Sequence, residues 1–261
     1  MFQAGQVIGV DGQNFGINGI YAPCVNLHRE ALNGRNYECY SEDPVISGEL
    51  AAAFIKGAKS NGVHCYLKHL ALYDSGPYTD KRVWLTEQNF RENYLRPFEI
   101  AIKDGGANAV MSCFNRIGAV WSGYNYALST GVLREEWGFR GSMITDWFNN
   151  YMNDYERGIL AGNDLWLHRM GLTHEDASSD TYAYYARRAC KNIIYTYVST
   201  EEARVAAQGG EPVDLTVCSV KLFYGWVWII VGIEAVMLAA LGVWIFFVIK
   251  RIRKHNAEKA A

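Results

Sequence analysis

The sequence predicts an α/β fold built on a parallel β-sheet and followed by a single transmembrane helix. Apolar, β-rich segments alternate with segments of helical periodicity over most of the chain, a pattern typical of parallel strands joined by helical crossovers. Residues 222–249 form an almost wholly apolar run, longer than the about 20 residues needed to cross a bilayer core. On this pattern alone, a (β/α) barrel and a doubly wound open sheet both stay open.

The length, charge and composition of the chain limit the number of domains and the classes of partner to expect. The 261 residues suffice for one barrel-sized domain or two small ones, and half of them are hydrophobic. The net charge of -2 gives no reason to expect a nucleic-acid partner. Trp, Tyr and Phe number 8, 17 and 11, which fits stacking against sugar rings, although core packing explains any single aromatic residue more simply.

The elements follow one another in a regular order. A short extended segment at 19–22 precedes a helix at 48–61, a strand at 63–67 and a longer helix at 86–103 with Thr86 as its N-cap. The predicted elements after these are a strand at 107–113, a helix at 126–136, a strand at 141–145, a candidate strand at 161–167 and a helix at 177–197. No GxGxxG motif follows a strand, which argues against a dinucleotide site.

The C-terminal region predicts a membrane anchor. Residues 198–221 are a polar linker, 222–249 the transmembrane helix and 250–261 a basic tail. Positively charged flanks stay on the cytoplasmic side, so we expect a single-pass cell-membrane protein with a cytoplasmic C-terminus and an extracellular catalytic domain. Glu234 interrupts the apolar run, and we assign it no role.

The chain start and the cysteines carry two further expectations. The first five residues have neither the basic nor the apolar region of a signal peptide, so an exported domain is expected to have its true N-terminus upstream.

The 6 cysteines form no CxxC and no metal-ligand pattern. We expect buried free thiols rather than disulfides, with Cys65 and Cys113 inside predicted strands.

Polar residues follow three predicted strands. Lys68-His69 follow 63–67, Asn115-Arg116 follow 107–113, and Asp146 follows 141–145. In barrel enzymes the catalytic groups come from the C-terminal ends of several strands. Asp146 is a candidate glycosidase nucleophile, although the local sequence alone favours a role in capping the next helix.

The remaining polar candidates are ambiguous by themselves. Lys68 and His69 could bind sugar hydroxyls or be a solvated lysine beside a buried histidine. Arg35 and Glu38 could clamp a substrate or form a loop salt bridge of little energetic value. No metal-ligand set and no GxSxG motif is present, so neither a metal, a cofactor nor acyl transfer is expected.

A run of longer motifs makes the sequence more specific. They are PCVNLHR at 23–29, NGRNYE at 33–38, YSEDP at 40–44, KH at 68–69, MSCFN at 111–115, WGFRG at 137–141 and ITDW at 144–147. In this order they resemble the barrel domain of family-three glycoside hydrolases, over roughly residues 10–197.

The resemblance implies a partial (β/α)8 TIM-type barrel in residues 1–197 and a retaining, β-glucosidase-like activity on terminal β-linked sugars. It assigns Asp146 as the nucleophile that forms the glycosyl-enzyme intermediate. The residues implied to bind or line the substrate are Arg35, Lys68, His69, Glu38 as the support of Arg35, Met111 and Trp147. The implied substrate is an oligosaccharide or β-glucoside.

The sequence also departs from the family. Phe114 stands where many members carry Tyr, the opening strand of the barrel is missing, and the acid/base is expected from a sandwich domain absent from this chain. The loop at 71–77 lacks the GHGDT-like run of the β-N-acetylglucosaminidase branch, which we reject. The alternatives are an inactive fragment, a non-catalytic carbohydrate-binding membrane protein, or a structural anchor without sugar affinity.

Overall fold

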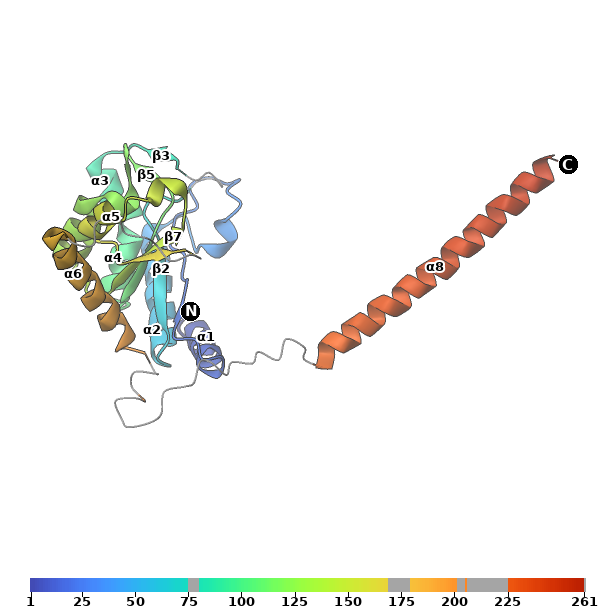
Figure 1. Cartoon of the computed structure of the whole chain (residues 1–261), viewed down its shortest axis with the longest axis horizontal. Coiled ribbons are helices and arrows are strands. Elements are labelled where there is room, and N and C mark those ends of the chain that lie inside the picture. Colours follow the sequence, from blue (N-terminus) through green and yellow to red (C-terminus); the bar gives the residue numbers. More distant parts are fainter. Residues whose placement is uncertain (75–79, 169–178, 201–204, 206–224, 261) are drawn as a thin grey trace. The chain divides into compact units, whose positions relative to one another are not determined.

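The computed structural model describes residues 1–74, 80–168, 179–200, 205 and 225–260 (Figure 1). The chain divides into two units, Met1–Val213 and Asp214–Ala261. Each unit is described by itself below.

The first unit is built on a parallel sheet with the strand order β1-β2-β4-β7-β8. The strands are β1 (Gly19–Ile20), β2 (His64–Leu70), β4 (Ala109–Ser112), β7 (Ser142–Trp147) and β8 (Leu165–Leu167). Every neighbouring pair is parallel, with Leu67 beside Val110 and Val110 beside Met143. The spatial order follows the chain order without reversal, which is the order of a barrel segment and not of a doubly wound sheet.

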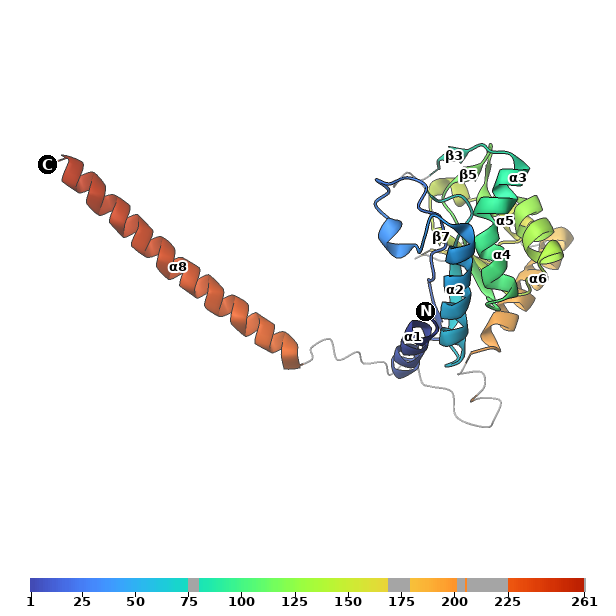
Figure 2. The same cartoon turned by 180° about the vertical axis from the view of Figure 1, so that it is seen from behind.

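Helices cover this sheet (Figure 2). They are α2 (Pro44–Lys59), α3 (Glu87–Asn89), α4 (Arg96–Lys103), α5 (Tyr155–Ala161) and α6 (Asp180–Tyr197), with π-helical segments at Phe90–Tyr94 and Ala127–Glu136. Single 3-10 turns lie at Asn36–Glu38, Ser122–Tyr124 and Asn150–Met152. Helices α2 and α4 contact β2, and their apolar side chains form one core with those of the sheet, while α6 contacts β7.

Local sequence explains where the helices begin. Helix α2 begins four residues before the predicted start, because the Asp43 carboxylate accepts hydrogen bonds from the amides of Val45 and Ile46 and Pro44 occupies the first turn. Thr86 caps α3 as predicted, by accepting from the amide of Asn89. The single helix predicted at 86–103 is wrong in detail, since it is divided near Pro97, which has no N–H to donate.

Helix α1 (Phe2–Asn14) was not predicted. It packs against α2 through glycines: a Cβ on Gly5 would lie 2.1 Å from the carbonyl oxygen of Phe54, and a Cβ on Gly57 would lie 2.1 Å from that of Phe2. The buried face of α1 consists of glycines, so it has no apolar periodicity for the sequence to reveal.

A small second sheet has the order β3-β5-β6, from β3 (Arg82–Val83), β5 (Arg116–Ile117) and β6 (Val120–Trp121). Strand β5 pairs parallel with β3 and antiparallel with β6. Arg116 follows the barrel strand β4 in the chain, as expected, and is itself part of this second sheet.

The second unit contains helix α8 (Gly225–Ala260). It begins three residues after the predicted transmembrane start and continues through the predicted tail to residue 260. Its Gly232–Arg251 portion is long and apolar enough to cross a membrane. Most of the predicted linker at 198–221 lies outside the described residues.

Candidate active site

Five of the predicted site residues come together at the C-terminal ends of the strands. Lys68 and His69 lie inside β2, which extends three residues beyond its predicted end, and Asp146 is the penultimate residue of β7. Arg35 and Glu38 lie on the connection between β1 and α2. Side chains at the carboxyl edge of a parallel sheet are well placed for binding and catalysis.

The carboxylate of Asp146 is only half satisfied. Its Oδ1 accepts a hydrogen bond of 2.7 Å from the amide of Trp147. Its Oδ2 is buried without a hydrogen-bond partner and lies 3.5 Å from Nε2 of His69. Asp146 caps no helix, because α5 is capped by Asp154. The capping role that the local sequence favoured is therefore wrong.

Asn26 fixes the tautomer of His69. The backbone amide of His69 donates to Asn26 Oδ1 at 2.9 Å, and Asn26 Nδ2 donates to the carbonyl of His69 at 3.0 Å. Nδ1 of His69 lies 3.1 Å from the same Oδ1, which can only accept, so Nδ1 carries the proton. Nε2 is then a bare acceptor and faces Nη2 of Arg35 at 3.3 Å.

Glu38 holds two cations. Its Oε1 pairs with Nε of Arg35 at 2.5 Å, and its Oε2 lies 3.3 Å from Nζ of Lys68. The Arg35 guanidinium also lies over the ring of Tyr73, 5.3 Å from the centroid. Glu38 is thus more than a local salt bridge, because it joins a loop residue to a strand residue.

The charges of the site are set by burial and by these cations. Burial raises the pKa of Asp146, opposed by the Trp147 amide and by the charges of Arg35 and Lys68. Burial holds the pKa of His69 well below its ordinary value, and the same two cations lower it further. For Glu38, burial acts to raise the pKa, but the hydrogen bond from Arg35 and the charge of Lys68 outweigh it and lower the pKa. The cluster therefore combines a neutral imidazole, two cations and the carboxyl groups of Glu38 and Asp146.

Two predicted substrate residues lie beside this cluster. Met111 is buried in β4, the strand between β2 and β7, where it is opposite Ile144. Trp147 ends β7 and is 50% exposed, so its ring is available to a ligand. Asn115 and Arg116 do not join the cluster: Asn115 donates to the carbonyl of Ala71, and Arg116 pairs with Asp80.

Sequence reasoning missed Asn26 and Tyr73 as site residues. Asn26 is only 3% exposed, and the ring of Tyr73 packs edge-on against His69 with centroids 5.2 Å apart. Asn26 lies within the PCVNLHR motif of the family resemblance, and Tyr73 follows the KH motif by four residues. A buried asparagine in the PCVNLHR run was the signal that could have identified the support of His69.

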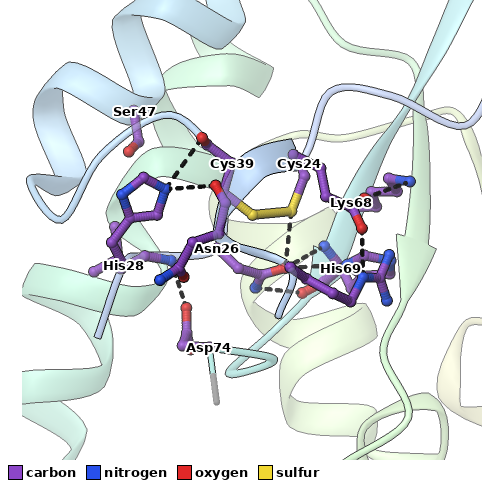
Figure 3. Close-up of a disulfide and its surroundings, with 12 residues drawn as sticks. Cys24, Asn26, His28, Cys39, Ser47, Lys68, His69 and Asp74 are labelled. Carbon is purple, nitrogen blue, oxygen red and sulfur yellow. Dashed lines mark hydrogen bonds and ion pairs between the residues drawn. A yellow bond between two sulfur atoms is a disulfide. The ribbon is translucent and has the colours of Figure 1, made fainter. Parts of the chain in front are cut away.

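The cysteine expectation is only partly confirmed. Cys65 and Cys113 are buried free thiols, and Cys190 is an exposed one. Cys24 and Cys39, however, form a disulfide beside the site (Figure 3), so the expectation of free thiols is wrong for this pair. Their spacing of 15 residues carries no recognisable signature, because the contact depends on how the loop folds back.

One sizeable cavity lies away from these residues. It encloses about 640 Å³ and is lined by residues such as Asn108, Trp137 and Gly141, at the N-terminal ends of β4 and β7. None of the five clustered site residues lines it. In barrel enzymes this end of the strands serves stability, so the charged cluster is the better candidate for a site.

The fold and the cluster together define a parallel α/β domain of barrel type with a polar site at its carboxyl edge. Residues 1–164 match the glycosyl hydrolase family 3 N-terminal domain. The chain belongs to this family.

Known relatives agree with this assignment. The chain is 41% identical over 166 residues to a beta-glucosidase of Rhizobium radiobacter and 35% identical over 167 residues to beta-glucosidase A of Butyrivibrio fibrisolvens. These alignments cover 62% and 63% of this chain, and the chain spans about a fifth (20%) of each relative.

Solved structures show the same fold. Beta-glucosidase 3B from Thermotoga neapolitana in complex with glucose has a TM-score of 0.71 at 30% identity, covering 81% of this chain and 31% of that one. A Bifidobacterium adolescentis GH3 beta-glucosidase has a TM-score of 0.69 at 27% identity, covering 77% and 30%. The partial barrel predicted from the sequence is therefore confirmed as the fold of this family.

Proposed function

We propose that this domain is the nucleophile-bearing part of a retaining β-glycosidase that hydrolyses terminal β-glucosides. The observation that carries the proposal is the Oδ2 atom of Asp146, which is buried without a hydrogen-bond partner beside His69 and is subject to the charges of Arg35 and Lys68. A carboxylate oxygen that accepts no hydrogen bond keeps its lone pairs available to form a bond to carbon. The relatives named beta-glucosidase support the choice of substrate.

In the proposed reaction, Oδ2 of Asp146 attacks the anomeric carbon. The bond from that carbon to the leaving oxygen breaks, and the oxygen takes a proton from an acid. Water then releases the sugar from the covalent ester and gives a proton to the same group. Arg35, Lys68 and His69 bind the sugar hydroxyls, and Glu38 holds the two cations in place.

The acid/base is proposed to come from sequence outside this chain. Both oxygens of Glu38 are engaged by cations, so it has no proton to give. Asp74 is 1% exposed and its Oδ1 accepts from the amide of Leu27 at 2.5 Å. Neither Glu38 nor Asp74 can therefore protonate a leaving group.

A trapping experiment tests the nucleophile without needing the acid. A 2-fluoro β-glucoside with a dinitrophenolate leaving group requires no protonation to depart, and its fluorine slows release of the sugar-ester. We expect the purified chain to gain one fluoroglucosyl unit, located by peptide mass spectrometry on Asp146. Asp146→Asn should gain none, whereas Asp104→Asn, a matched change at an exposed helix end, should react like the wild type.

Other outcomes separate the alternatives. An adduct on a different residue would reject Asp146 as nucleophile. Glucose binding without any adduct would favour a non-catalytic carbohydrate-binding protein. With the complete protein, the Asp146→Asn variant should lose hydrolysis of an aryl β-glucoside by several orders of magnitude.

We further propose that α8 anchors the protein in the cell membrane, with the first unit outside and the C-terminus inside. The support is the length and apolar character of Gly232–Arg251, whose side chains from Ile233 to Ile249 are largely exposed. Protease added to intact cells should remove the first unit and leave a C-terminal tag intact. Release of the tagged chain by alkaline carbonate would reject the anchor.

A further inference from the structure

The Cys24–Cys39 disulfide closes the loop that carries Arg35 and Glu38. It lies near Lys68 and His69 (Figure 3). The two cysteines are 15 residues apart in sequence, and their Cα atoms are 4.9 Å apart. Cys39 directly follows Glu38, so one backbone step joins the disulfide to the carboxylate that holds both cations.

Cys24 is also paired with the strand that carries Lys68. Its backbone forms parallel bridges to both Cys39 and Lys68. The two residues that flank Cys24 bond to Lys68: the amide of Val25 donates to the carbonyl of Lys68 at 2.9 Å, and the carbonyl of Pro23 accepts from the amide of Lys68 at 3.0 Å. The segment at Cys24 therefore lies between the end of the loop at Cys39 and strand β2 at Lys68. The disulfide fixes the distance between Cys24 and Cys39.

A second contact leads from the disulfide to His69. Sγ of Cys24 lies 3.6 Å from Oδ1 of Asn26, the atom that receives the Nδ1 proton of His69. A bridged sulfur carries no hydrogen, so this is a packing contact. The disulfide therefore touches the support of His69 as well as the segment that bears Glu38.

The rest of the loop is held by polar and cation–π contacts at its two ends, and not by core packing. None of residues 29–38 is buried, and Leu32 and Tyr37 are 93% and 86% exposed. Within the loop, the ring of His28 joins its two ends, with Nε2 at 2.9 Å from the carbonyl oxygen of Asn36 and 3.1 Å from that of Cys39. One imidazole N–H shared by two carbonyls is a weak substitute for core packing.

We propose that the Cys24–Cys39 disulfide is a positioning element for the sugar site, which rests on the function proposed above. It keeps Glu38 within reach of Lys68 and keeps Asn26 against His69, so that the sugar meets a prearranged set of donors. Reduction to two thiols leaves the fold of the sheet intact but frees the loop, and sugar affinity falls.

The test uses the full chain in detergent, the double variant Cys24→Ser/Cys39→Ser, and Cys190→Ser as a matched control at an exposed free thiol. Hydrogen–deuterium exchange should be faster at residues 29–38 in the double variant and unchanged in β4 and β7. The ¹⁵N shifts of the His69 ring should change with it. Glucose affinity, measured by calorimetry, should fall by up to about a hundredfold.

Dithiothreitol provides an independent arm if the double variant fails to fold. Its two thiols reduce the disulfide to two cysteine thiols and become a cyclic disulfide. The reduced wild type should behave like the double variant, and the double variant should not respond to the reductant. Cys190→Ser should match the wild type in every condition.

The outcomes separate this proposal from the proposed function. Unchanged exchange at residues 29–38 after disulfide loss would overturn the positioning role, and so would faster exchange with unchanged glucose affinity. Faster exchange and shifted His69 resonances in a chain that binds no glucose even when oxidised would uphold the positioning role and reject the sugar-binding function.

Discussion

Nε2 of His69 lies 3.5 Å from Oδ2 of Asp146, yet the two atoms form no hydrogen bond because both are acceptors. The Nδ1 proton of His69 is directed to Asn26, and Arg35 donates to Nε2. The histidine therefore shapes the site while leaving the carboxylate oxygen uncommitted. By fixing the tautomer of His69, Asn26 leaves Oδ2 of Asp146 without a hydrogen bond from the histidine.

Replacing that asparagine by an acid should reverse the arrangement. In Asn26→Asp, a carboxylate beside Nδ1 raises the pKa of His69, and the resulting imidazolium carries an Nε2 proton that can bind Asp146. The ring ¹⁵N shifts of His69 should report the doubly protonated form near neutral pH. Asn153→Asp, at an exposed turn, is the control and should leave the ring neutral. A ring that stays neutral in Asn26→Asp would contradict the predicted rise in the pKa of His69.

The pH dependence of activity should reflect the charge of Lys68 on Asp146. Burial raises the pKa of Asp146 while Lys68 opposes the rise, so the acid limb of kcat/KM should lie above the ordinary aspartate value of 3.8. In Lys68→Met the lysine charge no longer lowers the pKa of Asp146, so the acid limb of kcat/KM should move to higher pH in the complete protein. Lys103→Met, at an exposed helix end, should leave the limb in place. A shift to lower pH in Lys68→Met would contradict this electrostatic account.

Stability should fall as pH rises through the pKa of Asp74. Burial raises the pKa of this carboxyl from 3.8 to about 6, so the folded state retains its proton over a range where the unfolded state has lost it. Its contribution to the free energy of unfolding is roughly 3 kcal/mol. This contribution is fully present below about pH 4 and is lost above about pH 6. Urea unfolding between these values should show this loss in the wild type and in Asp104→Asn.

Asp74→Asn should remove most of that pH dependence, since its amide does not titrate and its oxygen can still accept from Leu27. Parallel stability curves for the wild type and Asp74→Asn would show that the carboxyl ionises without cost.

Loss of the disulfide should also lower stability. Closing a loop of 15 residues restricts the unfolded chain, and Cys24→Ser/Cys39→Ser should reduce the free energy of unfolding by about 3 kcal/mol. Cys190→Ser, at an exposed site, should stay within about 0.5 kcal/mol of the wild type. Equal unfolding midpoints for the double variant and the wild type in urea would contradict this estimate.

The parallel sheet was predictable because its strands are short apolar runs bounded by helical segments. The strand ends were not, since Lys68 and His69 continue β2 as polar residues whose backbone still pairs with neighbours. Hydrophobic pattern reports burial, while strand length depends on pairing. Helix α1 was missed for the related reason that its buried face is glycine.

The site was predictable only through the motifs of the family resemblance. Local sequence favoured a capping role for Asp146, but the next α-helix begins only at Tyr155 and is capped by Asp154. The link from Glu38 to Lys68 and that from Asn26 to His69 each join residues far apart in the chain. Such contacts leave no periodic trace in a single sequence.

The glycine contact between α1 and α2 limits what protein engineering can do at the start of this chain. Since Gly5 and Gly57 each face a carbonyl oxygen of the opposite helix, even alanine at either position would force the backbones apart. A consensus or helix-propensity redesign that fills these positions with alanine would thus weaken the domain that it aims to strengthen.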